Sequence, residues 1–391
     1  GNRTGIGART GFEQLALTGS GLLDLRLDQS FDVVQLLGTS LNAQLAGFSI
    51  GAVFGFDSNE ALTLDGDIAF ASMGGGNDTL SLGSVTAAGS YTGGAGTDAL
   101  RFTAAEPIVL TGSAIGFEQI ALRGDTLVVA GTLGAAGDAI HFGSGAQRLV
   151  VASGGTVAGA IDLGDGDDVF RLLAGANNQA SVSGGAGTDL YSLNLNGDRT
   201  GIGARSGFEQ LAIDGAGTLT LTLDQNFDVV QLFGTSLNAR LAGFGIGAVF
   251  GSDANEGLTL DGDIALASLG AGNDFLTLGS AVAGGSYSGG IGDDALAFTS
   301  TSPVVLTGSA SGFEQIALGG NRLVVAGTLG AADDRLSFGA GAQQLLVARG
   351  GTVAGAIDLG DGDDAFRLDA GAIQRGSING GAGTDLYSIG L

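Results

Sequence analysis

An internal duplication constrains this chain more than any other feature. Residues 197–391 align with residues 1–195 at a constant offset of 196 positions without a gap, and 142 of the 195 paired positions are identical. The stretch GGTVAGAIDLGDGDD recurs unchanged at 154–168 and 350–364. Two segments this similar must share one structure, and gapless repetition favours an architecture in which each unit stacks on the next.

A weaker duplication lies inside each unit, where Gly-Phe-Glu-Gln begins at residues 11, 116, 207 and 312. We therefore expect two repeat units, each made of two modules. The units are 1–196 and 197–391, and the modules are about 1–104, 105–196, 197–300 and 301–391. The phenylalanines of this motif are expected to stack in the core: Phe12, Phe117, Phe208 and Phe313.

Short apolar runs between glycine-rich corners predict strands. LTLDGDIAF at 62–70 alternates apolar with polar or small residues, and 44% hydrophobic content among 76 glycines is too high for a solvated coil. Corner residues Asp78 and Asp98 are 20 positions apart, which measures one coil. We expect an all-β parallel β-helix (β-solenoid) of about 20 residues per coil, with roughly nineteen coils forming an elongated rod on the order of 90 Å long.

The charge balance narrows the range of partners. Fifteen arginines oppose forty acids, giving a formal charge of −25, which argues against nucleic acid and against docking on an anionic membrane. No stretch of about 18 apolar residues is present, so no membrane insertion of this segment is expected. The first ten residues contain neither an initiator Met nor a signal-peptide core, which indicates a mature or internal fragment. The absence of cysteine and lysine suits a location outside a bacterial cell.

Glycine-rich nonapeptides at the corners predict calcium sites. Four segments match Gly-Gly-x-Gly-x-Asp-x-apolar-x, and four more match it without the first glycine: 93–101, 184–192, 289–297, 380–388, 73–81, 163–171, 269–277 and 359–367. Calcium takes six to eight oxygens, so two corners one coil apart would share an ion. The predicted pairs are Asp78 with Asp98, Asp168 with Asp189, Asp274 with Asp294, and Asp364 with Asp385.

The same residues have a second interpretation that needs no metal. An Asp in a glycine-rich corner also caps the backbone N–H groups of its own turn. Four further acids, Asp165, Asp167, Asp361 and Asp363, enrich two of the pairs. Stacked carboxylates without a cation would repel one another, which favours calcium, whereas the isolated motifs and the 21-residue pairs favour capping. Both interpretations stay open at this point.

In style the chain resembles the passenger domains of bacterial autotransporters, which are β-helical rods displayed outside the outer membrane. The stretches that carry the resemblance are 152–172, 348–368 and the GGAGTD corners, which are also similar to the calcium-binding corners of RTX proteins. The resemblance implies a β-helix on the bacterial cell surface, in a family that includes adhesins, biofilm proteins, proteases and lipases. The membrane barrel of that family is not part of this chain.

We therefore expect an extracellular structural or adhesive repeat segment of a surface fibre, acting as a stiff rod. The expected partners are the protein itself, by end-to-end stacking or by continuation of a longer array, and a host or matrix ligand. The alternatives are a calcium- or glycan-binding module and, third, a polysaccharide lyase-like enzyme. We expect no catalytic residues and no other cofactor. The duplication extends even to the stretch at 39–60 that looks least regular, and the single His141 is replaced by Ser337 at the equivalent position of the second unit.

Overall fold

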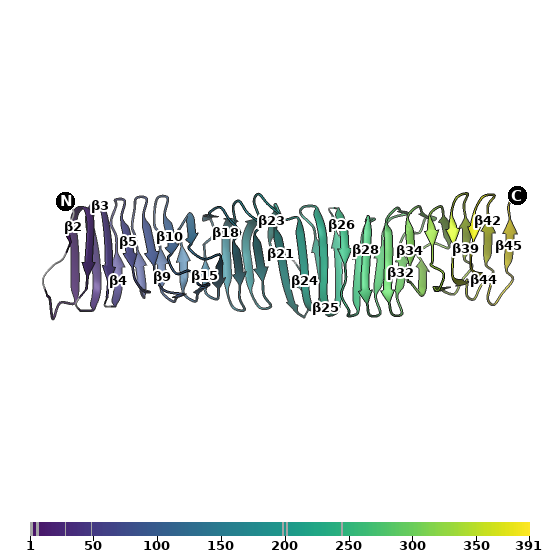
Figure 1. Cartoon of the computed structure of the whole chain (residues 1–391), viewed down its shortest axis with the longest axis horizontal. Coiled ribbons are helices and arrows are strands. Elements are labelled where there is room, and N and C mark those ends of the chain that lie inside the picture. Colours follow the sequence, from purple (N-terminus) through teal and green to yellow (C-terminus); the bar gives the residue numbers. More distant parts are fainter. Residues whose placement is uncertain are drawn as a thin grey trace. The chain divides into compact units, whose positions relative to one another are not determined.

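The chain is an all-β solenoid of parallel strands (Figure 1). The computed structural model describes residues 3–4, 8–27, 29–47, 49–197, 199–200, 202–243 and 245–391. These residues form strands and turns and contain no helix. Strands pair in parallel with strands about one coil away in the sequence, which confirms the fold predicted from the repeat and the corner spacing.

The chain divides into two compact units. Unit 1 comprises Gly1–Asn194 with Gly203–Phe208, and unit 2 comprises Leu195–Ile202 with Glu209–Leu391. Each unit opens with a two-residue strand and two long strands. In unit 1 these are β1 (Arg3–Thr4), β2 (Gln14–Arg26) and β3 (Phe31–Ala46), and in unit 2 they are β22 (Arg199–Thr200), β24 (Gln210–Thr222) and β25 (Phe227–Ala242).

The stretch at 39–60, which looks irregular in the sequence, is mostly strand. Strand β3 continues to Ala46, and β4 follows directly. The reason is the alternation of Leu41, Ala43 and Leu45, whose side chains are buried while those between them are exposed. The chain turns a corner within β3, where Ser40 adopts a positive φ of 55°.

After the long strands, the coils of unit 1 form two faces and, from β8 (Thr86–Ala87) onward, a third. The first face contains β4 (Ile50–Phe54), β6 (Phe70–Ser72), β9 (Ser90–Thr92), β12 (Ser113–Ile115) and β15 (Thr132–Leu133). The second contains β5 (Ala61–Leu64), β7 (Thr79–Leu82), β10 (Ala99–Phe102), β13 (Gln119–Leu122) and β16 (Ala139–Phe142). Strands β18 (Thr156–Asp162) and β20 (Asn177–Ser183) cross both of these faces, and β23 (Ala204–Ser206) follows β20. The third face contains β8 (Thr86–Ala87), β11 (Ile108–Leu110), β14 (Thr126–Val129), β17 (Arg148–Val151), β19 (Val169–Leu172) and β21 (Leu190–Asn196).

Unit 2 repeats the three faces. The first contains β26 (Ile246–Phe250), β28 (Leu266–Ala271), β31 (Ser286–Ile291), β34 (Ser309–Ser311), β37 (Thr328–Leu329), β40 (Thr352–Val353) and β43 (Ile373–Gln374). The second contains β27 (Glu256–Leu260), β29 (Phe275–Leu278), β32 (Ala295–Phe298), β35 (Gln315–Leu318), β38 (Arg335–Phe338), β41 (Ala356–Asp358) and β44 (Ser377–Asn379). The third contains β30 (Val282–Ala283), β33 (Val304–Leu306), β36 (Arg322–Val325), β39 (Gln344–Val347), β42 (Ala365–Leu368) and β45 (Leu386–Ile389).

Stacked aliphatic side chains form the core of each unit. On the second face of unit 1, Leu80 pairs with Leu62 on one side and with Leu100 on the other, and all three are fully buried. The parallel register places each inward side chain over its counterpart in the next coil, so the corners between strands stack as well. Coil length varies from 18 residues, where Ala61 lies beside Thr79, to 24, where Thr132 lies beside Thr156.

The phenylalanines of the Gly-Phe-Glu-Gln motif follow the prediction in three of four modules. Phe117, Phe208 and Phe313 are buried, but Phe12 is 58% exposed, so the prediction is wrong for Phe12. The ring of Phe208 packs edge-on against Tyr191 of the preceding coil, with 5.3 Å between ring centroids. The described residues before Phe12 offer no such ring, which leaves Phe12 uncovered.

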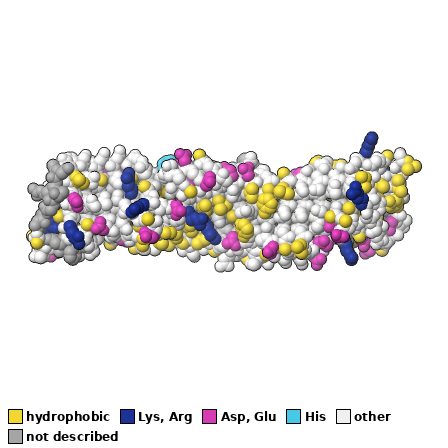
Figure 2. Space-filling view, viewed as in Figure 1, with side chains coloured by type: hydrophobic (Ala, Val, Ile, Leu, Met, Phe, Trp, Pro, Cys, Tyr) yellow, Lys and Arg dark blue, Asp and Glu magenta, His cyan; other side chains and the backbone are white. Residues whose placement is uncertain are grey.

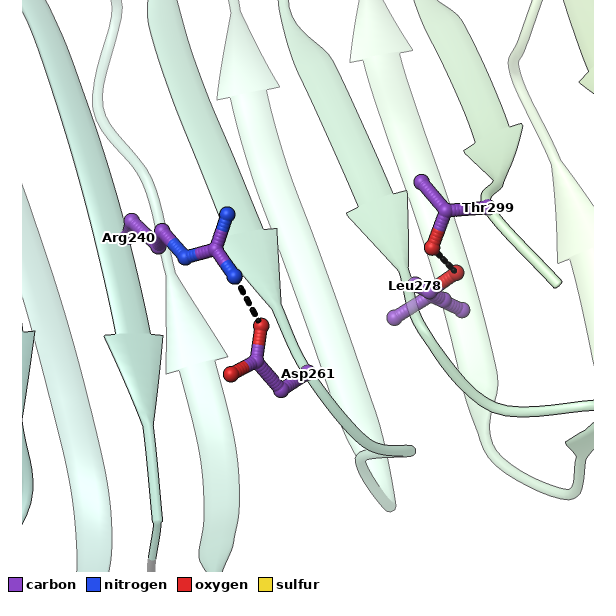
Figure 3. Close-up of polar contacts among 4 residues, drawn as sticks. All are labelled: Arg240, Asp261, Leu278 and Thr299. Atoms are coloured by element: carbon purple, nitrogen blue, oxygen red, sulfur yellow. Dashed lines mark hydrogen bonds and ion pairs between the residues drawn. The ribbon is translucent and has the colours of Figure 1, made fainter. Parts of the chain in front are cut away.

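Side chains also connect successive coils at the surface. In unit 2, Arg240 donates a 2.8 Å hydrogen bond to Asp261, 21 residues further on, and the Thr299 hydroxyl donates to the Leu278 carbonyl (Figure 3). Acidic side chains are spread over the visible surface of both units (Figure 2). In the described part of the chain no helix has the length and hydrophobicity to cross a membrane.

Candidate metal corners

The glycines of each corner are required by the stacking of coils. Gly94 and Gly96 have φ angles of 120° and 146°, a region that disfavours side chains. A Cβ on either one would also collide with a backbone carbonyl one coil earlier, that of Gly74 or of Gly76. The spacing of these two glycines therefore has a steric cause that is independent of any metal.

The first glycine of the nonapeptide makes room for the next coil and for the aspartate. A Cβ on Gly93 would lie 1.9 Å from the carbonyl oxygen of Gly116 in the next coil and 2.8 Å from Oδ2 of Asp98, and Gly289 has the same relation to Gly312 and Asp294. The four shorter motifs have a buried Met or Leu at this position instead: Met73, Leu163, Leu269 and Leu359. The difference between the two forms of the motif is thus a difference in what packs beside the carboxylate.

Each of the four predicted aspartate pairs is brought together one coil apart. The N–H of Asp78 donates to Oδ1 of Asp98 at 2.7 Å, and the N–H of Asp274 donates to Oδ1 of Asp294 at the same distance. The other two pairs share this bond: Asp168 to Asp189 at 2.7 Å, and Asp364 to Asp385 at 3.0 Å. Seven of the eight aspartates are buried, and Asp385 is exposed.

Two glutamates that the sequence reasoning missed extend the series in unit 1. The N–H of Glu60 donates to Oδ1 of Asp78, and the N–H of Asp98 donates to Oε2 of Glu118, both at 2.7 Å. In unit 2, Glu256 and Glu314 take the corresponding places. Glu118 and Glu314 belong to the Gly-Phe-Glu-Gln motif. Both follow an aspartate by 20 residues, so the coil length was the signal that could have found them.

A second series of caps lies at the surface of the same corners. Oδ1 of Asp167 accepts the N–H of Thr188 at 2.9 Å, and Asp363 does the same for Thr384. In the first corner pair, Asn77 takes this role and accepts the N–H of Thr97. Asp167 and Asp363 of the DGDD corners therefore also bond to the backbone of the neighbouring coil.

The corner aspartates do cap backbone N–H groups, but the prediction that each one caps its own turn is wrong. The corner carboxylates accept N–H groups of the adjacent coil, whereas the sequence interpretation placed the cap within the carboxylate's own turn. Since the coils pair in register, a carboxylate in one corner lies next to the N–H of the corner before it. These caps therefore join coils to one another.

Burial raises the pKa of several corner carboxylates. Burial, aided by the charges of Glu60 and Asp98, raises the pKa of Asp78 to about 7, although the hydrogen bond from the Glu60 N–H opposes the shift. Asp274 in unit 2 has its pKa raised to about 7 by the same causes. Burial also raises the pKa of Asp98, which gains a further increase from the charge of Glu118.

One oxygen of most corner aspartates has no hydrogen-bond partner. The buried Oδ2 atoms concerned belong to Asp78, Asp98, Asp168, Asp274, Asp294 and Asp364. Leaving an ionised oxygen buried and unbonded is costly, so each corner favours either a proton or a cation at this place. Across the described ranges, no group of three or more His, Cys, Asp or Glu side chains is arranged to hold a metal ion. Calcium binding at these corners stays a prediction.

His141, the single histidine, lies one coil after Glu118, and its backbone N–H donates to the Glu118 carbonyl at 2.8 Å. Its Nδ1 is 3.2 Å from Oδ2 of Asp162 on the second face of unit 1, and both side chains are exposed. In unit 2, Ser337 and Asp358 occupy the equivalent positions. The pair is thus a surface contact between neighbouring strands.

Comparison with known proteins gives no relative: no family model, no curated protein and no solved structure matches this chain. The assignment of the β-solenoid therefore rests on the chain's own repeat and strand pairing.

Proposed function

We propose that this chain is a structural segment of an extracellular bacterial fibre or surface adhesin, in which stacked coils act as a stiff rod. The observation that carries the proposal is the bonding between coils. Neighbouring coils are joined by parallel strand pairing on their faces and, at the aspartate corners, by a buried carboxylate that accepts an N–H of the coil before it. A structure bonded in this way along its length resists bending and local unfolding.

The resemblance to autotransporter passengers and the acidic, cysteine-free composition support an extracellular location. The test is electron microscopy of native surface material, with gold-labelled antibodies raised against this chain. We expect the label on thin fibres outside the cell. Label confined to the cell interior would overturn the proposal.

Calcium binding is a second candidate function. One observation favours it: the stacked pairs, such as Asp78 and Asp98, have buried Oδ2 atoms without a hydrogen-bond partner. A cation would offset the repulsion between carboxylates one coil apart. The test compares thermal unfolding at pH 8 in EGTA with unfolding in excess calcium. We expect a higher Tm with calcium and a smaller gain in the Asp98→Asn/Asp294→Asn variant, which keeps only the pairs at Asp168 and Asp364 intact. An unchanged Tm of the parent protein would count against calcium.

A further inference from the structure

The first face of each unit carries two files of side chains aligned by the strand register, all of them at least partly exposed except Ala212 in unit 2. In unit 1, strand register places Phe54 beside Ser72 and Ser72 beside Thr92, and it places Phe70 beside Ser90. File A of unit 1 runs through Gln14, Val33, Ala52, Phe70, Ser90, Ser113, Thr132, Thr156 and Asn177. File B of unit 1 runs through Ala16, Gln35, Phe54, Ser72, Thr92 and Ile115.

Neither file of unit 1 contains an ionisable side chain, although the chain has fifteen arginines and forty acids. Charges lie outside these files: Asp32 is exposed beside Val33 on β3, and the other two faces carry charges as well. Arg101 and Asp162 lie on the strands of the second face, and Arg148 lies on the third. An uncharged strip along many successive coils of so acidic a protein needs an explanation beyond solubility, since solubility favours charge.

Unit 2 repeats the uncharged strip. Its file A runs through Gln210, Val229, Ala248, Leu266, Ser286, Ser309, Thr328, Thr352 and Ile373. Its file B runs through Ala212, Gln231, Phe250, Ser268, Ser288 and Ser311. Several positions differ in identity between the units, but none of them acquires a charge.

Each strip has an apolar end and a hydroxyl end. At the apolar end of unit 1, the rings of Phe54 and Phe70 lie 5.4 Å apart at 43°, and Phe54 is 42% exposed. At the hydroxyl end, Ser90 and Ser113 are joined through their Oγ atoms at 3.1 Å, one coil apart. The strip of unit 1 therefore offers two rings, and that of unit 2 offers the ring of Phe250, followed in each by a ladder of groups that both donate and accept hydrogen bonds.

From this arrangement we infer that the first face of each unit binds a linear, uncharged polysaccharide laid along the coils. A pyranose ring has an apolar C–H face that packs on an aromatic ring and an edge of hydroxyls that exchange hydrogen bonds with Ser and Thr. A polymer presents these features on every sugar, so one sugar can pack on the rings while the following sugars lie along the hydroxyls, whose positions succeed one another at about 4.8 Å per coil. The formal charge of −25 repels acidic polysaccharides, and it also opposes side-by-side packing of two copies.

This inference adds a ligand to the proposed surface role and does not depend on it. The test measures binding of the full chain to cellohexaose, xylohexaose and mannohexaose by calorimetry, with oligogalacturonate as the acidic comparison. We expect at least one neutral oligosaccharide to bind, and no binding of the acidic one. Absence of binding to all three neutral sugars, or equal binding of the acidic one, would overturn the inference.

A variant locates the site on the strip. Phe54→Ala/Phe70→Ala, combined with Phe250→Ala/Leu266→Ala in unit 2, should weaken binding by about tenfold or more, because the stacking surface is lost. The matched control is Phe275→Ala, which removes an exposed ring from the second face of unit 2 and should leave binding unchanged.

Tm and circular dichroism establish that both variants fold. Unchanged affinity in the folded strip variant would overturn the placement. The placement would also be overturned if the parent protein sedimented as a dimer and the strip variant alone sedimented as a monomer, because a second copy would then cover the strip.

Discussion

The backbone N–H of Asp78 donates a 2.7 Å hydrogen bond to Oδ1 of Asp98, its equivalent one coil later. Both side chains are buried, and the contact recurs between Asp274 and Asp294. A carboxylate inside the corner thus completes the backbone hydrogen bonding of the coil before it. Because unbonded buried N–H groups are costly, this bond contributes directly to the stacking of coils.

Removing the carboxylate of Asp98 should destabilise unit 1. Asp98→Ala leaves the Asp78 N–H buried without an acceptor, which costs about 1–3 kcal/mol in the free energy of unfolding. Asp98→Asn keeps an acceptor oxygen and should cost less. Urea unfolding measures both variants, with Asp65→Ala at an exposed position as the control. Equal losses in the Ala and Asn variants would contradict the capping role.

Stability should fall as the pH rises toward neutrality. The pKa of Asp78 is about 7 in the folded protein and near 3.8 when unfolded. Its contribution to the free energy of unfolding is therefore fully present below about pH 4. That contribution is lost as the pH rises through about 7, where the buried acid must ionise. We expect Tm to decrease by several degrees from pH 5 to pH 8 in a calcium-free buffer.

An amide mimics the neutral acid and isolates this effect. Asp78→Asn/Asp274→Asn should flatten the pH dependence and retain stability at pH 8, whereas the exposed Asp65→Asn should follow the parent protein. A Tm that rises between pH 5 and pH 8 in the parent would refute the assignment of buried, proton-binding corners.

The corner glycines should be intolerant of side chains. Gly94→Ala places a Cβ against the Gly74 carbonyl at a φ of 120°, and we expect a loss of at least about 2 kcal/mol. Gly66→Ala is the matched control, because a Cβ there meets nothing within 4 Å. Thermal unfolding compares the two variants. Similar Tm values would show that close packing of Gly94 against the preceding coil is not needed for stability.

Much of the fold could be predicted from the sequence because a solenoid repeats in register. The 20-residue spacing of Asp78 and Asp98 equals the strand register observed between β7 and β10. The burial of Phe208 was predictable from its repetition, but the exposure of Phe12 was not, because burial depends on what the neighbouring coil supplies.

The site was predictable in part. The sequence indicated which aspartates lie in neighbouring, stacked corners. It did not reveal that their carboxylates bond to N–H groups of the previous coil, since a side chain's direction depends on the corner's backbone. Glu118 was missed because its motif, Gly-Phe-Glu-Gln, has no resemblance to the nonapeptide, and only the stacking brings it beside Asp98.

Hydrogen exchange at the corner amides tests the central claim most directly. If buried carboxylates join the coils, the N–H groups of Asp78 and Asp98 should exchange only when the whole unit unfolds, as slowly as the amides of the core strands. In Asp98→Ala, the Asp78 amide should become faster to exchange while the β14 amides stay protected. Rapid exchange of the Asp78 amide in the parent protein would contradict the account.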